Sequence, residues 1–334
     1  MDLALLVKRV EITVREELTT RTMPEVTITS KLSPSLSLSL ALALAPDVQE
    51  IYMRLPPSAF TFMATTINIM QPTLRALHLF THSEFRGSPL DSRACVELLR
   101  GLPCLQELSI GSKFIIDAWP VPEPVTFQLT HLAFRVPHNT LVTTGPETFT
   151  FVTSSSTHSL QHLRLVGPFL PSVGDDNEAI YDLEPFDSLQ TLEISPGYPG
   201  DYGYDDETDE RRLDAELAQV HYLIDQILSI PLSVQHLTIS DYDDNVSTIR
   251  GDIIDKESLL WNIPHSCWTV KLRLEHLKAK TLLDFLTSED SATLKWTHLS
   301  VVTERCFHGV ELKKIVEQCE KKRITFVCRG NPRD

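Results

Sequence analysis

The sequence has no long apolar run, no clustered basic stretch and, among its six cysteines, no Cys-x-x-Cys pair. No apolar segment approaches the roughly 20 residues that cross a bilayer, which argues against a membrane-spanning protein. Met1–Arg15 lacks a basic start followed by an apolar block, which argues against a secretion signal. Cysteines with this spacing are typical of reduced, packed thiols, so we predict an intracellular protein, cytoplasmic or nuclear.

Positive charge is also scarce, since 30 Lys and Arg face 45 Asp and Glu, for a formal net charge of −15. The excess acid lies between Asp175 and Asp244, which contains 19 acidic residues and only two basic ones. Phosphate contacts need clustered Lys and Arg, so we expect no nucleic-acid partner and no membrane-surface partner. Within this stretch, residues 195–212 are predicted to form an acidic, partly disordered insertion loop.

Motifs for catalysis and cofactor binding are likewise missing. There is no Gly-x-Ser-x-Gly, no His-Glu-x-x-His and no Gly-Lys-Ser/Thr. Asp201–Glu210 and Asp241–Asp252 are rich in carboxylates, but the position where a calcium-binding EF-hand loop requires glycine has Asp206 in the first and Val246 in the second. We therefore predict no cofactor and no metal, and an enzymatic role stays open only as an alternative.

What the sequence does contain is a repeat of the form Leu-x-x-Leu-x-(Leu/Ile/Phe). The five clear copies are Leu74–Leu79, Leu105–Ile110, Leu129–Phe134, Leu160–Leu165 and Leu189–Ile194. They start 31, 24, 31 and 29 residues apart, close to the period of about 20–29 residues of leucine-rich repeats. Looser copies are Val7–Ile12, Val48–Met53, Val234–Ile239, Thr269–Leu274, Trp296–Val301 and Lys321–Phe326.

The repeat predicts the fold class. Alternation at its fourth to sixth positions is the period of a strand with one apolar face, and a lone strand cannot bury that face. Successive units stacked as parallel strands build a continuous core and need crossovers on the other face. We thus predict one α/β domain over residues 1–334, an irregular right-handed leucine-rich-repeat-like solenoid. Its parallel strands would line the concave face and its short helices the convex face.

Several crossovers are predicted to be helical from their apolar periodicity and their Gly or Pro stop signals. They are Ser92–Arg100, Leu213–Ser229, Lys280–Leu286 and Val310–Cys319. The alternating segment Ser35–Leu44 fits either a strand or a buried helix, and we favour the helix.

The chain resembles the leucine-rich-repeat-like C-terminal regions of F-box proteins, especially the divergent sets found in mushroom-forming fungi. The resemblance is carried by the segments LQELSI, LTHLAF, LQHLRL and LQTLEI, and by the opening LALLVKRVEIT and the close ELKKIVEQCEKKRITFVC. It implies a right-handed solenoid that recognises a protein and presents it to a ubiquitin ligase.

Two departures from the family pattern shape the expectation. No Leu-Pro-x-Glu F-box opening is seen before Val48, which leaves docking to the ligase open. Regular leucine-rich repeats also carry Asn at the ninth position, whereas the five clear copies have other residues there: His82, Lys113, Pro137, Pro168 and Gly197. The backbone groups of each turn must then find other hydrogen-bond partners, different from repeat to repeat, which predicts an irregular solenoid.

In such a fold the third, fifth and seventh residues of each unit face the concave surface, which is the surface that solenoids commonly use for binding. The candidate binding residues are His78, Glu107, His131, Arg135, His162, Arg164, Glu193, His236, Arg273 and His298. Four histidines share the third position, so a metal site is conceivable, but the neighbouring unit offers Thr191 where a third ligand would be needed. The alternative for the whole set is a solvated sheet surface.

We therefore predict a non-enzymatic protein–protein interaction module, similar to the substrate-recognition part of an F-box ubiquitin-ligase adaptor, whose protein partner the sequence does not identify. The alternatives are a leucine-rich-repeat scaffold unrelated to ubiquitin and, in a different class, an unrecognised enzyme.

Overall fold

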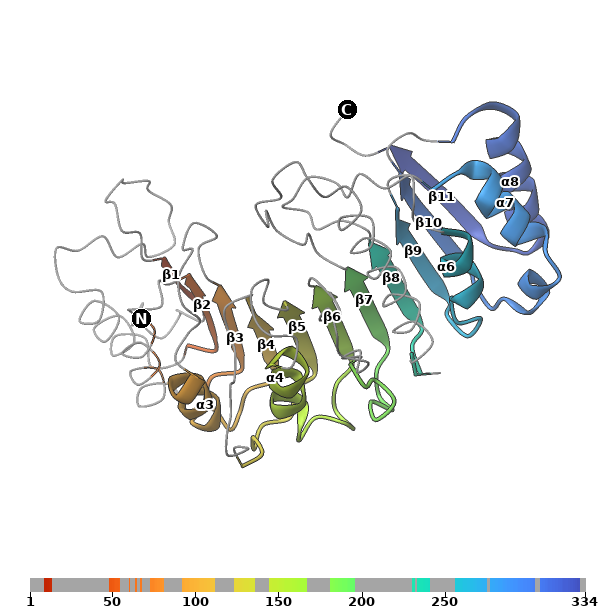
Figure 1. Ribbon diagram of the computed structural model, residues 1–334. Helices are drawn as coiled ribbons and strands as arrows, with labels where there is room; N and C mark the ends of the chain where they lie inside the picture. Colours follow the sequence, from red (N-terminus) through yellow and green to blue (C-terminus); the bar gives the residue numbers. More distant parts are fainter. Residues whose placement is uncertain are drawn as a thin grey trace, which may run out of the picture. The chain divides into compact units, whose positions relative to one another are not determined.

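The computed structural model places the repeated segments in two compact units, residues 1–160 and 161–334. The residues that it describes are 9–13, 48–54, 60, 64, 67, 73–80, 92–111, 123–135, 144–166, 181–195, 230–231, 233–240, 256–274, 277–303 and 307–330. Each unit is a parallel sheet with short helices (Figure 1).

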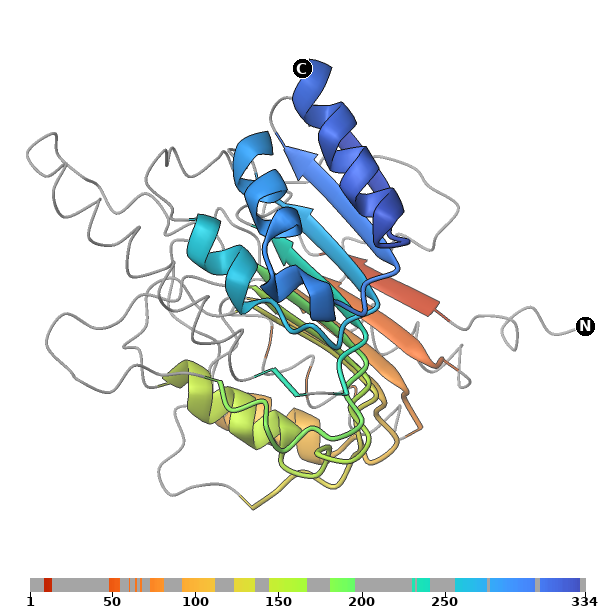
Figure 2. The ribbon, with the colours of Figure 1, turned by 90° about the vertical axis from the view of Figure 1, so that its right-hand side faces the viewer.

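In unit 1 the strands are β1 (Arg9–Thr13), β2 (Glu50–Arg54), β3 (Ala76–Phe80), β4 (Glu107–Ile110) and β5 (His131–Arg135). Each strand pairs in parallel with the next strand along the chain. The helices are α3 (Ser92–Arg100) and α4 (Thr144–Thr153), which lie on one side of these strands (Figure 2).

In unit 2 the strands are β6 (His162–Val166), β7 (Thr191–Ser195), β8 (His236–Ser240), β9 (Thr269–Arg273), β10 (His298–Thr303) and β11 (Thr325–Gly330). They too are parallel and follow chain order. The helices are α6 (Lys256–Asn262), α7 (Ala279–Thr287), the 3-10 turn η2 (Asp290–Thr293) and α8 (Gly309–Lys321). The predicted class, a leucine-rich-repeat-like α/β solenoid, is confirmed.

The core is built from the fourth and sixth residues of each repeat, counting the first Leu-type residue of the repeat as position 1. Leu108 and Ile110 pair directly with Leu132 and Phe134, and all four side chains are at most 2% exposed. The same positions in unit 2 include Leu163, Leu165, Leu192, Ile194, Leu237 and Ile239, all buried and in register. Burying one such side chain contributes about 1.5–3 kcal/mol, so these apolar rows drive the stacking of the units.

Position 2 provides a repeated backbone contact at the start of each strand. The Arg75 carbonyl accepts hydrogen bonds from the N–H groups of Gln106 and Glu107, at 2.8 and 2.9 Å. The Gln190 carbonyl accepts from Gln235 and His236 in the same way, at 2.9 and 3.0 Å. This contact gives the backbone N–H groups at the strand starts a hydrogen-bond partner without the asparagine of regular leucine-rich repeats. The ninth positions considered above lie outside the described residues.

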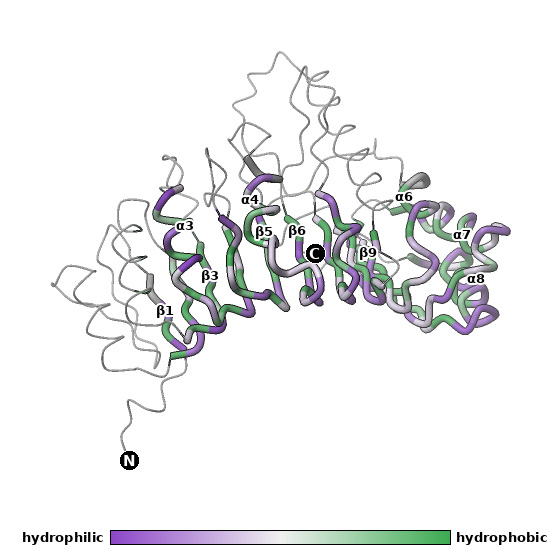
Figure 3. Tube along the Cα trace, turned by 90° about the horizontal axis from the view of Figure 1, so that it is seen from below, coloured by the Kyte–Doolittle hydropathy of each residue, from purple (hydrophilic) through white to green (hydrophobic). Residues whose placement is uncertain are grey.

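The helices follow their sequence signals. α3 has the predicted bounds, buries Ala94, Cys95, Leu98 and Leu99 on one stripe, and ends where the Gly101 N–H donates to the Glu97 and Leu98 carbonyls. α7 and α8 each extend a residue or two beyond the predicted segments. Figure 3 shows hydrophilic stretches along α8, and its side chains Lys313 and Lys314 are exposed. Among the helices in the described ranges, none has the length and apolar character of a membrane span.

Two of the looser units are in a different register from the one predicted. Val270 pairs with Leu237, so the unit predicted to start at Thr269 starts at Cys267. Phe326 pairs with Leu299, so the last unit starts at Arg323 and not at Lys321. In both segments apolar residues alternate over a longer stretch than one repeat, so the repeat pattern fits two starting residues that are two positions apart. A shift by two residues keeps every side chain on the same face, so the face assignments are unaffected.

Several predicted features lie outside the described residues. They are the helices over Ser35–Leu44 and Leu213–Ser229, the insertion loop of residues 195–212 apart from Ser195, and the carboxylate-rich segments Asp201–Glu210 and Asp241–Asp252.

Candidate protein-binding face

Each strand turns one row of side chains toward the core and the other toward the opposite face, which we call the open face. Positions 3, 5 and 7 of each repeat are on the open face, although Val166, Ser195 and Ser240 at position 7 are buried. In β5, for example, exposed His131 and half-buried Ala133 and Arg135 alternate with buried Leu132 and Phe134. β8 shows the same alternation, with exposed His236 and half-buried Thr238 beside buried Leu237 and Ile239.

All ten candidate binding residues are on the open face by strand register. Unit 1 carries His78, Glu107, His131 and Arg135, and unit 2 carries His162, Arg164, Glu193, His236, Arg273 and His298. His131, His236 and His298 are exposed, whereas His78 is only 4% exposed. Their role in binding stays a prediction, which the proposal below takes up.

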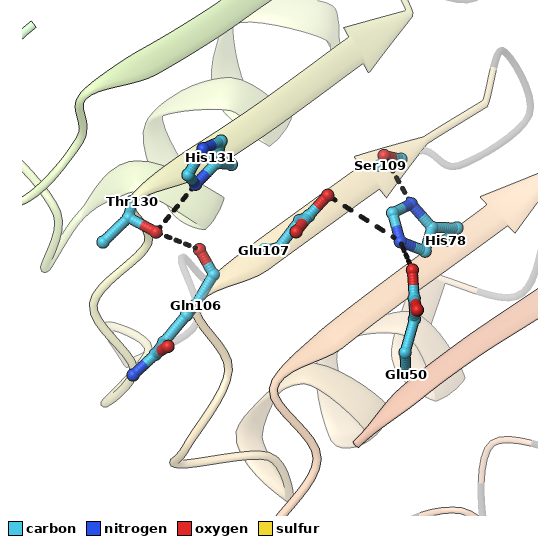
Figure 4. Close-up of polar contacts among 7 residues, drawn as sticks. All are labelled: Glu50, His78, Gln106, Glu107, Ser109, Thr130 and His131. Atoms are coloured by element: carbon cyan, nitrogen blue, oxygen red, sulfur yellow. Dashed lines mark hydrogen bonds and ion pairs between the residues drawn. The ribbon is translucent and has the colours of Figure 1, made fainter. Parts of the chain in front are cut away.

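In unit 1 four residues contact His78, and three of them, Glu50, Glu107 and Ser109, are drawn in Figure 4. The His78 ring stacks on Tyr52, with centroids 3.9 Å apart and planes at 11°. Its Nδ1 lies 2.8 Å from Ser109 Oγ, and its Nε2 lies 3.4 Å from Glu50 Oε1 and 3.9 Å from Glu107 Oε1. These contacts come from β2, β3 and β4, which the parallel register brings side by side.

The surroundings decide the proton positions on His78. Carboxylates only accept hydrogen bonds, so Nε2, which faces Glu50 and Glu107, carries a proton. At 3.4 Å the Nε2–Glu50 contact is an electrostatic contact and too long for a good hydrogen bond. In the neutral ring the Ser109 hydroxyl then donates to Nδ1. Burial lowers the pKa of His78, and the Glu107 and Glu50 carboxylates oppose this shift without cancelling it.

This lowered pKa predicts a pH dependence of stability. Between the folded pKa of His78 and its ordinary value of 6.5, the unfolded chain binds more protons than the folded chain. Acidification from about pH 8 to about pH 5.5 should therefore reduce the contribution of His78 to the free energy of unfolding. The variant His78→Gln has no such titrating group and should not show this loss. Urea unfolding followed by circular dichroism at the two pH values measures this.

The free-energy cost of His78→Gln should be larger at the higher pH. The matched control is Ser300→Ala, a substitution at the same position of β10, which should change stability equally at both pH values. A pH-independent cost of His78→Gln would contradict the assignment.

Ser109, His78 and Glu50 also have the composition of a nucleophile, a base and an orienting carboxylate. An acyl-transfer site needs N–H donors aimed at a developing oxyanion. β4 is paired along its length with β3 and β5, and the Gly111 N–H just after it donates to the Leu79 carbonyl at 2.8 Å. The ladder therefore uses the backbone donors near Ser109, which favours a partly exposed polar network around the buried His78 over a hydrolase site.

The open-face residues named from the sequence include none from the first two repeats, which contain β1 and β2. They therefore miss half of the residues in this cluster. Glu50 and Tyr52 are positions 3 and 5 of the segment VQEIYM, and Arg9 is position 3 of VKRVEI. The Arg9 guanidinium carbon lies 4.0 Å from the centre of the Tyr52 ring, which extends the stack on His78 by a cation–π contact. The same position rule applied to the looser units would have found all three.

Two exposed histidines share a second arrangement. Thr130 Oγ1 lies 2.9 Å from His131 Nδ1 and donates to the Gln106 carbonyl at 3.2 Å. Thr297 repeats this with His298 at 2.9 Å and the Trp268 carbonyl at 3.1 Å. Because a hydroxyl has one proton, each threonine must accept from Nδ1–H of its histidine. The Thr-His dipeptides in LTHLAF and WTHLSV are the sequence signal of this arrangement.

The third-position row of unit 2 alternates histidine and threonine across six strands. The paired residues are His162, Thr191, His236, Thr269, His298 and Thr325. Successive histidines are thus two strands apart, about 9.5 Å between their backbones, with a threonine on the strand between them. Within the described ranges, no group of three or more His, Cys, Asp or Glu is placed to hold a metal.

Charge pairing on the open face of unit 2 involves Arg164 and Glu193 of neighbouring strands. Arg164 Nε lies 3.2 Å from Glu193 Oε1, with both side chains partly exposed. The geometry does not meet hydrogen-bond criteria, so this is a charge contact. The two charges cancel locally.

Comparison with known proteins supports the fold. No protein-family model matches the sequence, and no curated protein matches it. Among solved structures, the chain is similar to the leucine-rich repeat-containing protein LegL7 from Legionella pneumophila, with a TM-score of 0.55 and 14% identity, over 97% of this chain and 91% of that one.

A second structure, of a protein from Bacteroides fragilis, has a TM-score of 0.38 and 13% identity, over 86% of this chain and 68% of that one. That score is too low to support a shared fold. At 14% identity the likeness to LegL7 shows the leucine-rich-repeat fold alone.

Proposed function

We propose that this chain is a non-enzymatic protein-interaction module that receives its partner on the open face of the sheet, similar to the substrate-recognition part of an F-box ubiquitin-ligase adaptor. The observation that carries the proposal is the open face itself. In both units it presents polar and charged side chains, while the apolar row on the opposite side of the strands is buried. Extended one-sided sheets of this kind are the surfaces that solenoids use for binding.

Photo-crosslinking tests the location of the binding face. A photoreactive amino acid replaces His131 or His298 on the open face, or Lys280 on α7 as the control on the helix side. The same crosslinked protein should be recovered from the first two positions and not from Lys280. Recovery from Lys280 alone would contradict the proposal.

Affinity capture separates the adaptor from the scaffold. The resemblance to F-box proteins supports the adaptor, and recovery of cullin-ligase subunits would agree with it. A productive capture without those subunits favours a leucine-rich-repeat scaffold unrelated to ubiquitin. The Ser109–His78–Glu50 cluster does not favour an enzyme, because no oxyanion donor accompanies it among the described residues.

A further inference from the structure

Two carboxylates converge on one buried nitrogen at the open face of unit 1 (Figure 4). Glu50 Oε1 and Glu107 Oε1 lie 3.4 and 3.9 Å from His78 Nε2. The His78 side chain is only 5% exposed, whereas those of Glu50 and Glu107 are 32% and 45% exposed. We call these three residues the acidic notch. A ligand can reach its carboxylates from solvent, while the imidazole lies buried behind them.

The strand register places the two glutamates on either side of a small residue. Glu50 of β2 and Glu107 of β4 both pair with Ala76 of β3, so their backbones are two strands apart, about 9.5 Å. In this row of the open face only the methyl group of Ala76 separates them. One planar side chain laid between the glutamates can therefore contact both carboxylates.

The negative charge of the acidic notch is not neutralised within the part of the chain that the structure describes. There, neither Glu50 nor Glu107 has an ion pair with a lysine or an arginine. Burial lowers the pKa of His78, so its ring is neutral at neutral pH. On the open face of unit 2, by contrast, Glu193 lies 3.2 Å from Arg164. The acidic notch thus offers two carboxylates to a cation.

The Arg9 guanidinium of the chain itself lies beside the acidic notch and not in it. Its carbon is 4.0 Å from the centre of the Tyr52 ring, on which it stacks. Among the described residues, no ion pair joins Arg9 to Glu50 or Glu107. The two carboxylates therefore stay available to a cation from another molecule.

The buried nitrogen is a second and independent indication of a ligand. His78 Nε2 is inaccessible to solvent and has no hydrogen-bond partner. Leaving a buried polar atom without a partner costs free energy, so such an atom calls for a bound group that supplies one. Nε2 points between the two carboxylates, which places the missing partner in the acidic notch.

From these contacts we propose that the acidic notch binds an arginine side chain of the partner protein. A guanidinium has five N–H donors in a planar fork, so its separate nitrogens can donate to Glu50, Glu107 and His78 Nε2. A lysine ammonium is a single, strongly hydrated nitrogen and would have to reach all three acceptors from one point. The contacts of Nε2 with the carboxylates are too long to be good hydrogen bonds, so little is lost when the carboxylates turn to the ligand.

Binding of a guanidinium requires the other neutral tautomer of His78. A guanidinium only donates hydrogen bonds, so Nε2 must accept and the ring proton must lie on Nδ1. The Ser109 hydroxyl, 2.8 Å from Nδ1, then accepts from Nδ1–H instead of donating to it. Because a hydroxyl can do either, the exchange of tautomers needs no movement of the strands.

This inference rests on the proposed function and deepens it, because it names one residue type of the partner and the place on the open face that receives it. A chain of net charge −15 attracts any cationic peptide weakly. The test must therefore compare variants of equal net charge.

The test uses the full chain and the acetylated, amidated peptide Gly-Ser-Arg-Ser-Gly at neutral pH, with binding followed by amide chemical shifts in a deuterated sample. Two control peptides carry lysine or uncharged citrulline in place of arginine. The variant Glu50→Gln/Glu107→Gln removes the charge of the acidic notch and keeps the side-chain shapes. The matched control Glu147→Gln/Glu317→Gln makes the same charge change at exposed positions of α4 and α8.

We expect saturable shifts at Glu107 and Ser109 with the arginine peptide. The lysine peptide should bind at least about three-fold more weakly, and the citrulline peptide at least about ten-fold. Glu50→Gln/Glu107→Gln should weaken binding of the arginine peptide about five-fold or more, and the helix-side control by less than about two-fold. The single variant Glu107→Gln, at the more exposed carboxylate, should weaken it about two-fold to three-fold.

The tautomer of His78 gives a readout that general charge attraction would not change. In a sample with 15N-labelled histidine, the ring signals of His78 are those that the variant His78→Gln lacks. Saturation with the arginine peptide should make the protonated nitrogen unprotonated and the unprotonated nitrogen protonated.

Four results would overturn the inference. They are no binding of the arginine peptide, equal binding of the citrulline peptide, binding that Glu50→Gln/Glu107→Gln leaves unchanged, and binding that leaves the His78 ring signals in place. Partner crosslinking from His131 and His298 that persists beside any of these results would leave the proposed function standing.

Discussion

Replacing Leu192 by alanine is expected to lower the free energy of unfolding by about 2–5 kcal/mol. The Leu192 side chain is fully buried and lies at position 4 of β7, in register with Leu163 of β6 and Leu237 of β8. Alanine would leave a cavity within this apolar row, and the neighbouring strands, each fixed by its own pairing, can close it only in part. Urea unfolding followed by circular dichroism measures the change.

The matched control is Glu193→Ala, one residue further along the same strand and on the open face. It removes a partly exposed charge contact with Arg164, which contributes at most about 1 kcal/mol. A cost below about 0.5 kcal/mol for Leu192→Ala would contradict the placement of the leucine row inside the core.

Phe285→Ala should cost about 3–5 kcal/mol for a different reason. Phe285 of α7 is fully buried between two tryptophans. Its ring is 5.1 Å from that of Trp261 in an edge-on arrangement at 70°, and 5.6 Å from that of Trp296. The substitution therefore removes both a large buried volume and the aromatic contacts that join α6, α7 and the segment before β10.

Tryptophan fluorescence during urea unfolding is a suitable readout, because both neighbours of Phe285 are tryptophans. Phe285→Leu is the control, since it keeps most of the volume, and it should cost roughly 1–1.5 kcal/mol. Equal costs for the leucine and alanine variants would show that the aromatic cluster does not organise the helix layer of unit 2.

Much of the fold could be predicted from the sequence, because strand and helix periods are local properties of the chain. All eleven proposed segments contain or overlap a strand, and α3 has the predicted bounds. The predicted register is wrong for β9 and β11. At β9 the segments CWTVKL and TVKLRL both have apolar residues at their fourth and sixth positions, so the pattern fits either start. The distinguishing signal is the turn before the strand, where the Cys267 N–H donates to the Pro264 carbonyl as the Val234 N–H donates to that of Pro231.

The sequence predicts which residues lie on the open face better than it predicts which of them contact one another. Strand parity alone puts His78 and Glu107 on the open face, but it does not show that His78 is buried. That burial follows from the pairing of Tyr52 with His78, residues 26 positions apart in sequence, which stacks their rings. Contacts of this kind depend on the register between strands, which the spacing of leucines within one strand does not determine.

The leucine-bearing segments stack as parallel strands in chain order and in one register. Amide–amide nuclear Overhauser effects in a deuterated sample test it at β7 and β8, which are separated by 40 residues of sequence. Parallel stacking in this register predicts cross-peaks that connect the strands in the pairing Thr191–His236, Leu192–Leu237 and Ile194–Ile239. Cross-peaks in the reversed order, with Thr191 near Ile239 and Ile194 near His236, would contradict it.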